Sequence, residues 1–364
     1  MTEVRAFRRG DDLDAFLSLY EQVFGRVRDP AWFDWKYAAG PAVSAPTIVV
    51  AVSDGTDGAE SGDLVGARPF LPMQLAVGDR RVVAVQPVDA MVHPEHRRQG
   101  VFTVMTEWAL AAFEASEAAL CFNFPNEAAA AGNRRLGWRQ VQERASFYRF
   151  LDPARVAASA DLRPLAKAAA SAVAPAVSGY SAMRRAMAPD PDAVSVRRER
   201  TVPVAELAAR YRARPPDAIH VVRDAAFWEH CSANPDWRYE TYLADDDESA
   251  LLLGRSTRPD HPVARVTEVL PPGAERSRAA LVALLRRALQ DHDDAALLVA
   301  PPLAGATDLL ADLGFLCDHD PPLSYVTTAT NHFVRTLTDE WTIDGVDIDD
   351  AANWTLTFVE RDTN

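Results

Sequence analysis

At 364 residues the chain is too long for one ordinary domain and about right for two, taking roughly 100–200 residues per domain. Hydrophobic residues make up 48% of the chain and charged residues 25%, proportions that exclude a largely disordered or fibrous protein. Acidic residues outnumber basic residues 52 to 38, and the formal charge of −14 repels the phosphates of nucleic acid and anionic lipid, so we expect neither as a partner.

Predicted strands and helices alternate along the first half of the chain. Apolar residues at helical spacing predict helices, and short runs of β-branched and apolar residues predict strands. In chain order the predicted elements are a strand at 4–8, a helix ending at 17–20, an aromatic segment at 32–37, strands at 47–52 and 88–92, a helix from 101, a strand at 118–124 and a helix led by Asn126. This order predicts helices layered against a sheet, an α/β or α+β fold.

The second half repeats this order, at a nearly constant offset of 178 residues in the best-matching part. The turn Leu136-Gly137-Trp138, for example, corresponds to Leu313-Gly314-Phe315. We therefore expect two similar domains at 1–151 and 194–330, joined by a helical insert and linker at 152–193. The tail at 331–364 has two strand-like segments, at 341–343 and 354–358, and we expect it to pair with the second sheet.

The most informative local pattern lies between residues 88 and 110. A run of β-formers ends at His93-Pro94, and Arg97-Arg98-Gln99-Gly100 then leads into an amphipathic helix. The first N–H groups of a helix lack partners and carry roughly half a positive charge, Gly100 allows close backbone approach, and arginine forks bind phosphate oxygens. The pattern predicts a local binding site for a polyphosphate on an otherwise acidic protein.

These residues resemble the acetyl-CoA motif of the GNAT acetyltransferases, Arg/Gln-x-x-Gly-x-Gly/Ala between a strand and a helix. The first four places fit, and Phe102 stands where the family has a small residue. The family's next motif resembles the strand at 118–124, the helix led by Asn126 and the Gly137-Trp138 turn.

The resemblance implies acetyl-CoA as co-substrate, with its pantetheine arm between splayed strands near 88–92 and 118–124. It implies a direct attack by an acceptor amine, without a covalent enzyme intermediate. Asn126 would touch the cofactor near the thiol, and a backbone N–H near Val92 would meet the thioester oxygen. The cofactor-binding residues it implies are Met91, Val92, Arg97, Arg98, Gln99, Gly100, Val101, Phe102, Thr103 and Asn126.

The resemblance leaves the proton-transfer groups open. Many family members have a tyrosine as general acid at the place of Asn133, and an asparagine has no proton of useful pKa to donate, so this role passes to water or to another side chain. Asp89 is our first choice as the base, although a capped, solvated carboxylate explains it equally well. We therefore name Asp89 and Asn126 as candidate catalytic residues.

The corresponding loop of the second half, at 272–280, has no glycine at the place of Gly100. We expect this copy to bind CoA poorly and the reaction to lie in the first half, with a small-molecule amine as acceptor and a homo-oligomer as an option. Two alternatives remain: an aminoacyl-tRNA-dependent peptidyl transferase, which also uses paired GNAT-like domains, and a non-catalytic protein whose two copies have both decayed.

The remaining composition indicates a cytoplasmic protein without a metal. Cys121, Cys231 and Cys317 have no paired spacing, and His93 and His96 lack a third ligand nearby. The first residues lack a secretory signal, and the scarcity of lysine beside acidic runs is typical of a salt-loving organism. The aromatic segment at 32–37 and Cys121 are expected in the core.

Overall fold

The computed structural model describes residues 2–38, 40–53, 62–159, 194–258, 263–273, 276–325 and 330–361, together with residues 55, 179 and 327. The chain forms two compact units. The first unit comprises Met1–Gln142 with Asn331–Asn353, and the second comprises Glu143–Thr330 with Trp354–Asn364. Most of the expected helical insert and linker at 152–193 lies outside the described residues.

The first unit is built on one mixed sheet with the strand order β1-β2-β3-β4-β6-β16-β7, in which β5 also pairs with β3. Its strands are β1 Thr2–Ala6, β2 Ile48–Ser53, β3 Leu64–Val77, β4 Arg80–Pro87, β5 Met91–Val92, β6 Ala118–Asn123, β7 Arg139–Arg144 and β16 Thr330–Thr336. A small hairpin, β17 Thr342–Ile343 with β18 Val346–Asp347, follows. Its helices are α1 Arg9–Phe24, α2 Pro30–Tyr37, α3 Val101–Glu114 and α4 Glu127–Arg135, with 3₁₀ turns at Pro94–His96 and Ala351–Asn353.

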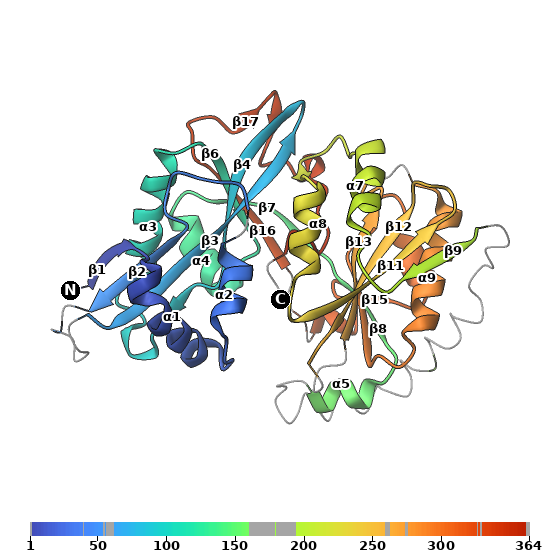
Figure 1. Ribbon diagram of the computed structural model, residues 1–364, viewed down its shortest axis with the longest axis horizontal. Helices are drawn as coiled ribbons and strands as arrows, with labels where there is room; N and C mark the ends of the chain where they lie inside the picture. The colour runs from blue at the N-terminus through green and yellow to red at the C-terminus, as the bar shows by residue number, and fades with distance from the viewer. Residues whose placement is uncertain are drawn as a thin grey trace. The chain divides into compact units, whose positions relative to one another are not determined.

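Helices cover both faces of this sheet (Figure 1). On one face the aromatic side chains of α1 and α2 form a core with Val50 and Ala67, and on the other face Met105 and Phe113 of α3 form a second core with Phe70. The aromatic segment at 32–37 therefore lies in the core, as the sequence predicted.

Local sequence explains where these helices begin and end. Pro30 occupies the first turn of α2, and the Asp29 carboxylate accepts a hydrogen bond from the Trp32 N–H at 2.8 Å. Helix α1 ends at Gly25, whose left-handed φ of 69° suits a residue without a side chain.

The strands β4 and β5 are two parts of one strand interrupted by a bulge. Both pair antiparallel with β3, and between them Asp89 has a φ of 38°. On its other side β4 pairs in parallel with β6, and this pairing ends at Val85 and Cys121 although β6 continues to Asn123. The two strands separate beyond that point, which agrees with the splay expected near 88–92 and 118–124.

The second unit has a seven-stranded sheet with the order β15-β8-β14-β13-β12-β11-β9. Its strands are β8 Phe147–Phe150, β9 Val196–Glu199, β11 Trp237–Ala244, β12 Ala250–Ser256, β13 Val263–Leu270, β14 Leu297–Ala300 and β15 Leu316–Cys317, with a short β10 at His220–Val221. Its helices are α5 Pro153–Ser159, α7 Val204–Ala213, α8 Ala225–Ser232, α9 Arg278–Asp291 and α10 Thr307–Asp312, with a 3₁₀ turn at Leu323–Tyr325.

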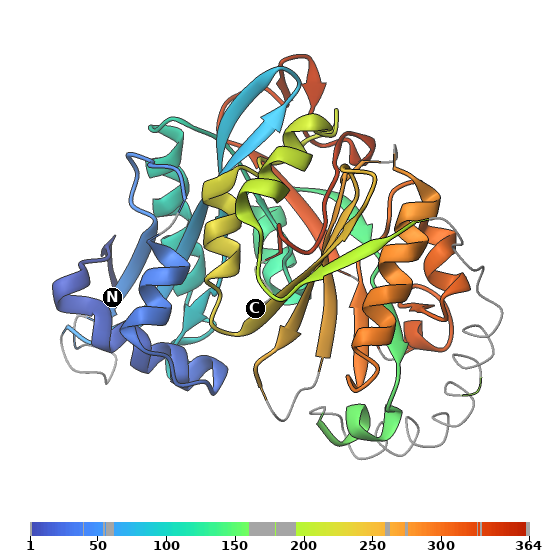
Figure 2. The ribbon, with the colours of Figure 1, turned by 45° about the vertical axis from the view of Figure 1, so that its right-hand side comes forward.

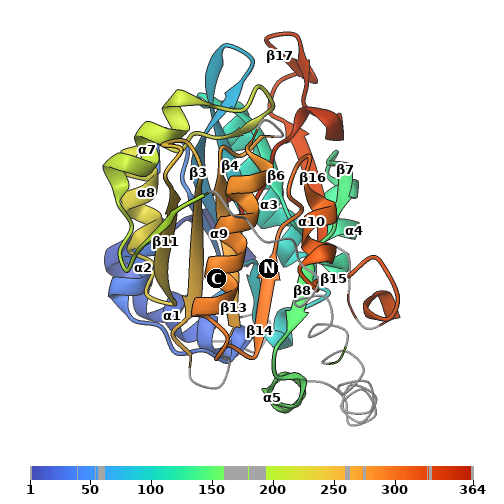
Figure 3. The same cartoon turned by 90° about the vertical axis from the view of Figure 1, so that its right-hand side faces the viewer.

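This sheet also lies between helices. Helix α9 covers one face, whereas α7 and α8 lie on the other (Figures 2 and 3). The apolar residues of α9, such as Leu284, form a core with Leu253 and Val266 of the sheet. Both units are mixed α/β layers of the same type, as expected from the internal repeat.

The last strand of each half lies in the sheet of the other half. Strand β16 pairs with β6 in the first sheet, so the expectation that the C-terminal segment pairs with the second sheet was wrong for this strand. Strand β8, which we assigned to the first domain, pairs with β14 and β15 in the second sheet. Residues 354–358 do not form the expected strand. Trp354 pairs with Ile219 in an isolated bridge, and the four residues after it have no strand structure.

In the described part of the chain, no helix combines the length and the apolar character needed to cross a membrane.

Candidate functional site

The turn between β5 and α3 is held by hydrogen bonds from its own side chains. Arg97 Nε donates to the Val92 carbonyl at 3.2 Å, and Gln99 Nε2 donates to the Glu95 carbonyl at 3.0 Å. Arg98 has a left-handed φ of 64°. Arg97 and Gln99 therefore shape the turn, while Arg98 is exposed at its surface.

Gly100 leaves the N-terminus of α3 open. It is the N-cap residue with a φ of 86°, and no side chain caps the helix there. A Cβ atom placed on Gly100 would meet nothing within 4 Å. The first N–H groups of α3, those of Val101, Phe102 and Thr103, lack intrahelical partners, and no side chain caps them.

Phe102 narrows the space between α3 and α4. A Cβ on Gly132 of α4 would come within 2.9 Å of the Phe102 ring, so the ring lies directly against the backbone of α4. A glycine at position 132 leaves room for the ring at this place.

Arg68 lies beneath Phe102 and was missed by the sequence analysis. Its side chain, on β3, is only 3% exposed, and its Cζ lies 4.9 Å from the Phe102 ring centroid and 5.4 Å from that of Phe70. Its Nε is buried without a hydrogen-bond partner, and among the described residues no carboxylate forms an ion pair with it. Burial lowers the pKa of Arg68 to about 10.

The two candidate groups on α4 have different surroundings. Asn126 is exposed at the N-cap, where its Oδ1 accepts a hydrogen bond from the Ala129 N–H at 3.0 Å, leaving the side-chain amide as a donor. Asn133 is fully buried, and its Nδ2 donates to Asn123 Oδ1 at 3.2 Å. Asn133 is therefore a buried hydrogen-bonding residue in the place of the family's general acid.

Asp89 lies on the opposite face of the sheet from α3. Its Oδ2 is 2.6 Å from Lys36 Nζ and accepts a hydrogen bond from the Tyr37 hydroxyl at 2.6 Å. Both contacts use Oδ2, so residues of α2 orient the carboxylate. Its Oδ1 can therefore accept a hydrogen bond from a further donor. The sequence did not indicate this contact, because 52 residues separate Tyr37 from Asp89.

The other expected residues have structural positions. The Met91 side chain is fully buried in the core beside α1 and α2, so at this position only the backbone is available to a ligand. Cys121 lies in the core as expected, and burial raises the pKa of its thiol to about 12, which leaves no thiolate for nucleophilic attack. Within the described ranges, no group of three or more His, Cys, Asp or Glu side chains is arranged to hold a metal ion.

Comparison with known proteins gives the family of the first half. Residues 3–141 match a family model described as an acetyltransferase (GNAT) domain. No curated protein sequence matches the chain.

Solved structures resemble both halves together. The chain superposes on a GCN5-related N-acetyltransferase from Anabaena variabilis with a TM-score of 0.61 and 11% identity, covering 93% of this chain and 73% of that one. For Eis1 from Mycobacterium abscessus the TM-score is 0.53 and the identity 16%, with 93% and 74% covered. For a tandem GNAT protein from the clavulanic acid biosynthesis pathway the TM-score is 0.53 and the identity 14%, with 93% and 100% covered.

At these identities the solved structures establish only the fold of the chain. The family model establishes the family of residues 3–141. Residues 3–141 therefore form a GNAT acetyltransferase domain, and the chain has the fold of the tandem GNAT structures.

Proposed function

We propose that the first unit transfers an acetyl group from acetyl-CoA to the primary amine of a small molecule, by direct attack in a ternary complex. The observation that carries this proposal is the open N-terminus of α3. Gly100 combines a left-handed φ of 86° with free space on the side that a Cβ would occupy, and no side chain caps the helix. This is the geometry that a diphosphate needs to reach several backbone N–H groups at once.

In this proposal the backbone N–H groups from Arg98 to Thr103 bind the diphosphate, with Arg97 and Gln99 holding the turn. The backbone of Met91 and Val92 binds the pantetheine arm where β4 and β6 separate. Arg68, a buried guanidinium with five donors and no carboxylate partner among the described residues, donates to a carbonyl oxygen of that arm. The helix cap uses only Oδ1 of Asn126, so its side-chain amide hydrogens can donate hydrogen bonds near the thioester.

Proton transfer requires a base for the amine and a source of protons for the departing thiolate. We assign the first role to Asp89, whose Oδ1 is free of the two bonds that Lys36 and Tyr37 make to Oδ2. Asn133 supplies no acid, because it is a buried amide hydrogen-bonded to Asn123. The thiolate then takes its proton from water.

Calorimetric titration with acetyl-CoA tests the binding site directly. The wild-type protein should bind one acetyl-CoA per chain, and Gly100→Glu should abolish binding because a carboxylate would occupy the anion site. Gly25→Glu is the matched control, since Gly25 also has a left-handed φ, 69°, and a Cβ placed on it would likewise meet nothing within 4 Å. If acetyl-CoA gives no heat with the wild-type protein, or if both variants lose binding equally, the proposal is wrong.

A screen of primary amines by free-thiol release then tests transfer. We expect release of CoA with at least one class of amine, and none with Gly100→Glu. The second candidate, a protein that binds the carrier without catalysis, is favoured by the Phe102 ring against Gly132 and by the buried Asn133. Binding of acetyl-CoA with no thiol release across the amine classes would support this second candidate instead.

A further inference from the structure

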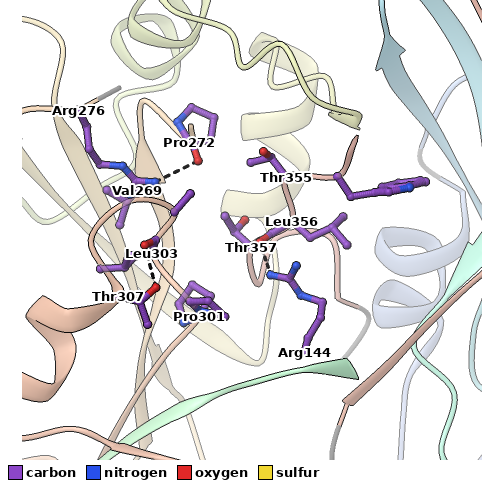
Figure 4. A pocket seen from close by; sticks show the side chains of 13 residues that line it. Arg144, Val269, Pro272, Arg276, Pro301, Leu303, Thr307, Thr355, Leu356 and Thr357 are labelled. Atoms are coloured by element: carbon purple, nitrogen blue, oxygen red, sulfur yellow. Dashed lines mark hydrogen bonds between the residues drawn. The ribbon is translucent and has the colours of Figure 1, made fainter. Parts of the chain in front are cut away.

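The second unit contains a cavity where its own central strands separate. Strands β13 and β14 run parallel and pair from Val263 and Leu297 to Arg265 and Val299, and no pairing between them continues beyond Val299 in the described residues. A cavity of about 120 Å³ lies beyond this point (Figure 4). Its lining residues are Arg144, Val269, Pro272, Arg276, Pro301, Pro302, Leu303, Ala304, Thr307 and Trp354 to Thr357.

Two arginines, Arg276 and Arg144, face this cavity from different segments of the chain (Figure 4). Arg144 is the last residue of β7 and belongs to the second unit, which begins at Glu143. Arg276 Nε donates to the Gly273 carbonyl at 2.8 Å and Nη2 donates to the Pro272 carbonyl at 3.0 Å, whereas Nη1 is buried with no partner. Arg144 Nη2 donates to the Leu356 carbonyl. Carbonyl oxygens, which carry no formal negative charge, thus orient both guanidinium groups.

No carboxylate in the described part of the chain pairs with either arginine. Burial lowers the pKa of both groups, and that of Arg276 falls to about 10. Both arginines are half-buried. Cations withdrawn from water are normally paired, and two without a carboxylate partner beside a cavity leave a site to which an anion is attracted.

Two buried carboxylates beside the cavity wall are bound by Arg223. Glu268 and Glu360 accept hydrogen bonds from it at 2.5 and 2.6 Å, and the Thr357 hydroxyl lies 3.1 Å from the first carboxylate and 2.9 Å from the second, so that it donates to one of them at a time. This network fixes the C-terminal segment that forms one wall of the cavity. Burial has the larger effect on the pKa of both cavity arginines and lowers it, while Glu360 raises that of Arg144 and Glu268 raises that of Arg276.

We propose that this cavity of the second unit binds a small oxyanion, the carboxylate or phosphate group of a small molecule, between Arg144 and Arg276. Arginine forks match the oxygens of both groups. The volume, about 120 Å³, is below the roughly 300–1,000 Å³ of pockets that enclose drug-sized ligands, so a whole nucleotide-bearing carrier does not fit. The cavity is then an anion site separate from the proposed acetyl-CoA site. This inference does not depend on acetyl transfer by the first unit.

Inorganic phosphate and acetate, titrated separately by calorimetry, serve as probes. The titrations use the Gly100→Glu variant, so that phosphate binding at the N-terminus of α3 does not contribute. Arg276→Met and Arg144→Met are then introduced singly in that background, and Arg276→Lys and Arg144→Lys keep the charge if a methionine variant fails to fold. Arg278→Met is the matched control, because Arg278 is exposed two residues away and pairs with Asp308 at 2.6 Å.

We expect one anion per chain, with affinity reduced roughly 10-fold to 100-fold by either methionine substitution, less by the lysine substitutions, and unchanged by Arg278→Met. Binding of phosphate alone assigns a phosphate-bearing ligand, binding of acetate alone assigns a carboxylate, and binding of both assigns a general oxyanion site. If neither probe binds, or if all variants bind equally, the inference is overturned. Two acetyl-CoA molecules bound per chain of the otherwise unaltered protein would also overturn it, because the cavity would then hold the whole carrier.

Discussion

Replacing Arg68 with methionine should make the protein more stable and at the same time weaken its binding of acetyl-CoA. Arg68 is 3% exposed, its Nε lacks a hydrogen-bond partner, and no described carboxylate pairs with it. A buried charge of this kind destabilises the fold, and a residue that does so is retained where a ligand compensates it.

The magnitude follows from the shift of its pKa. The lowering from 12.5 to about 10, caused by burial, corresponds to a cost of roughly 3 kcal/mol in the folded state without ligand. The contacts of the guanidinium with the Phe102 and Phe70 rings offset about 1–2 kcal/mol of this. Methionine keeps the apolar contact with both rings, so we expect a net gain of about 1–2 kcal/mol, or roughly 2–8 °C in the melting temperature.

Differential scanning calorimetry of the ligand-free protein measures this gain, and titration with acetyl-CoA measures the loss of binding. Arg5→Met is the control with the opposite sign, because Arg5 donates to both oxygens of the buried Asp12 at 2.7 Å. That variant should lose about 1–3 kcal/mol of stability. A lower melting temperature for Arg68→Met would show that the guanidinium is well compensated in the free protein and would refute the reasoning.

Three further substitutions have distinct expected outcomes. Asn126→Ala should cost about 1 kcal/mol in urea unfolding and weaken acetyl-CoA binding, whereas Asn126→Asp keeps the helix cap and should weaken binding only. Asp89→Asn should lower kcat and leave the Kd for acetyl-CoA unchanged; an unchanged kcat would remove it as the base. His220 is neutral in the fold because burial lowers its pKa from 6.5 to about 4. The unfolded chain binds that proton first as the pH is lowered, so the free energy of unfolding of the wild-type protein should fall by up to about 3 kcal/mol between pH 6.5 and 4. Urea midpoints measure this loss, and His220→Gln should remove this part of the acid sensitivity.

The motif residues could be predicted from sequence because their roles are local. Gly100 and Asn126 act on the helices that they precede, and both are found at N-cap positions. The two turns matched by the internal repeat also agree in detail, since Gly137 and Gly314 have φ values of 80° and 83°.

The order of elements and the turn before α3 could be predicted from the sequence alone, because each depends on residues a few positions apart, and the repeat could be found by comparing the two halves of the sequence. Only the tertiary structure decided which sheet β8 and β16 join, since strand pairing between distant segments leaves no local signal. It also decided that Arg68 lies unpaired beneath Phe102, and that Arg144 and Arg276, 132 positions apart in the numbering, face one cavity. Arginines are ordinarily surface residues, and burial without a partner is a property of the packed fold.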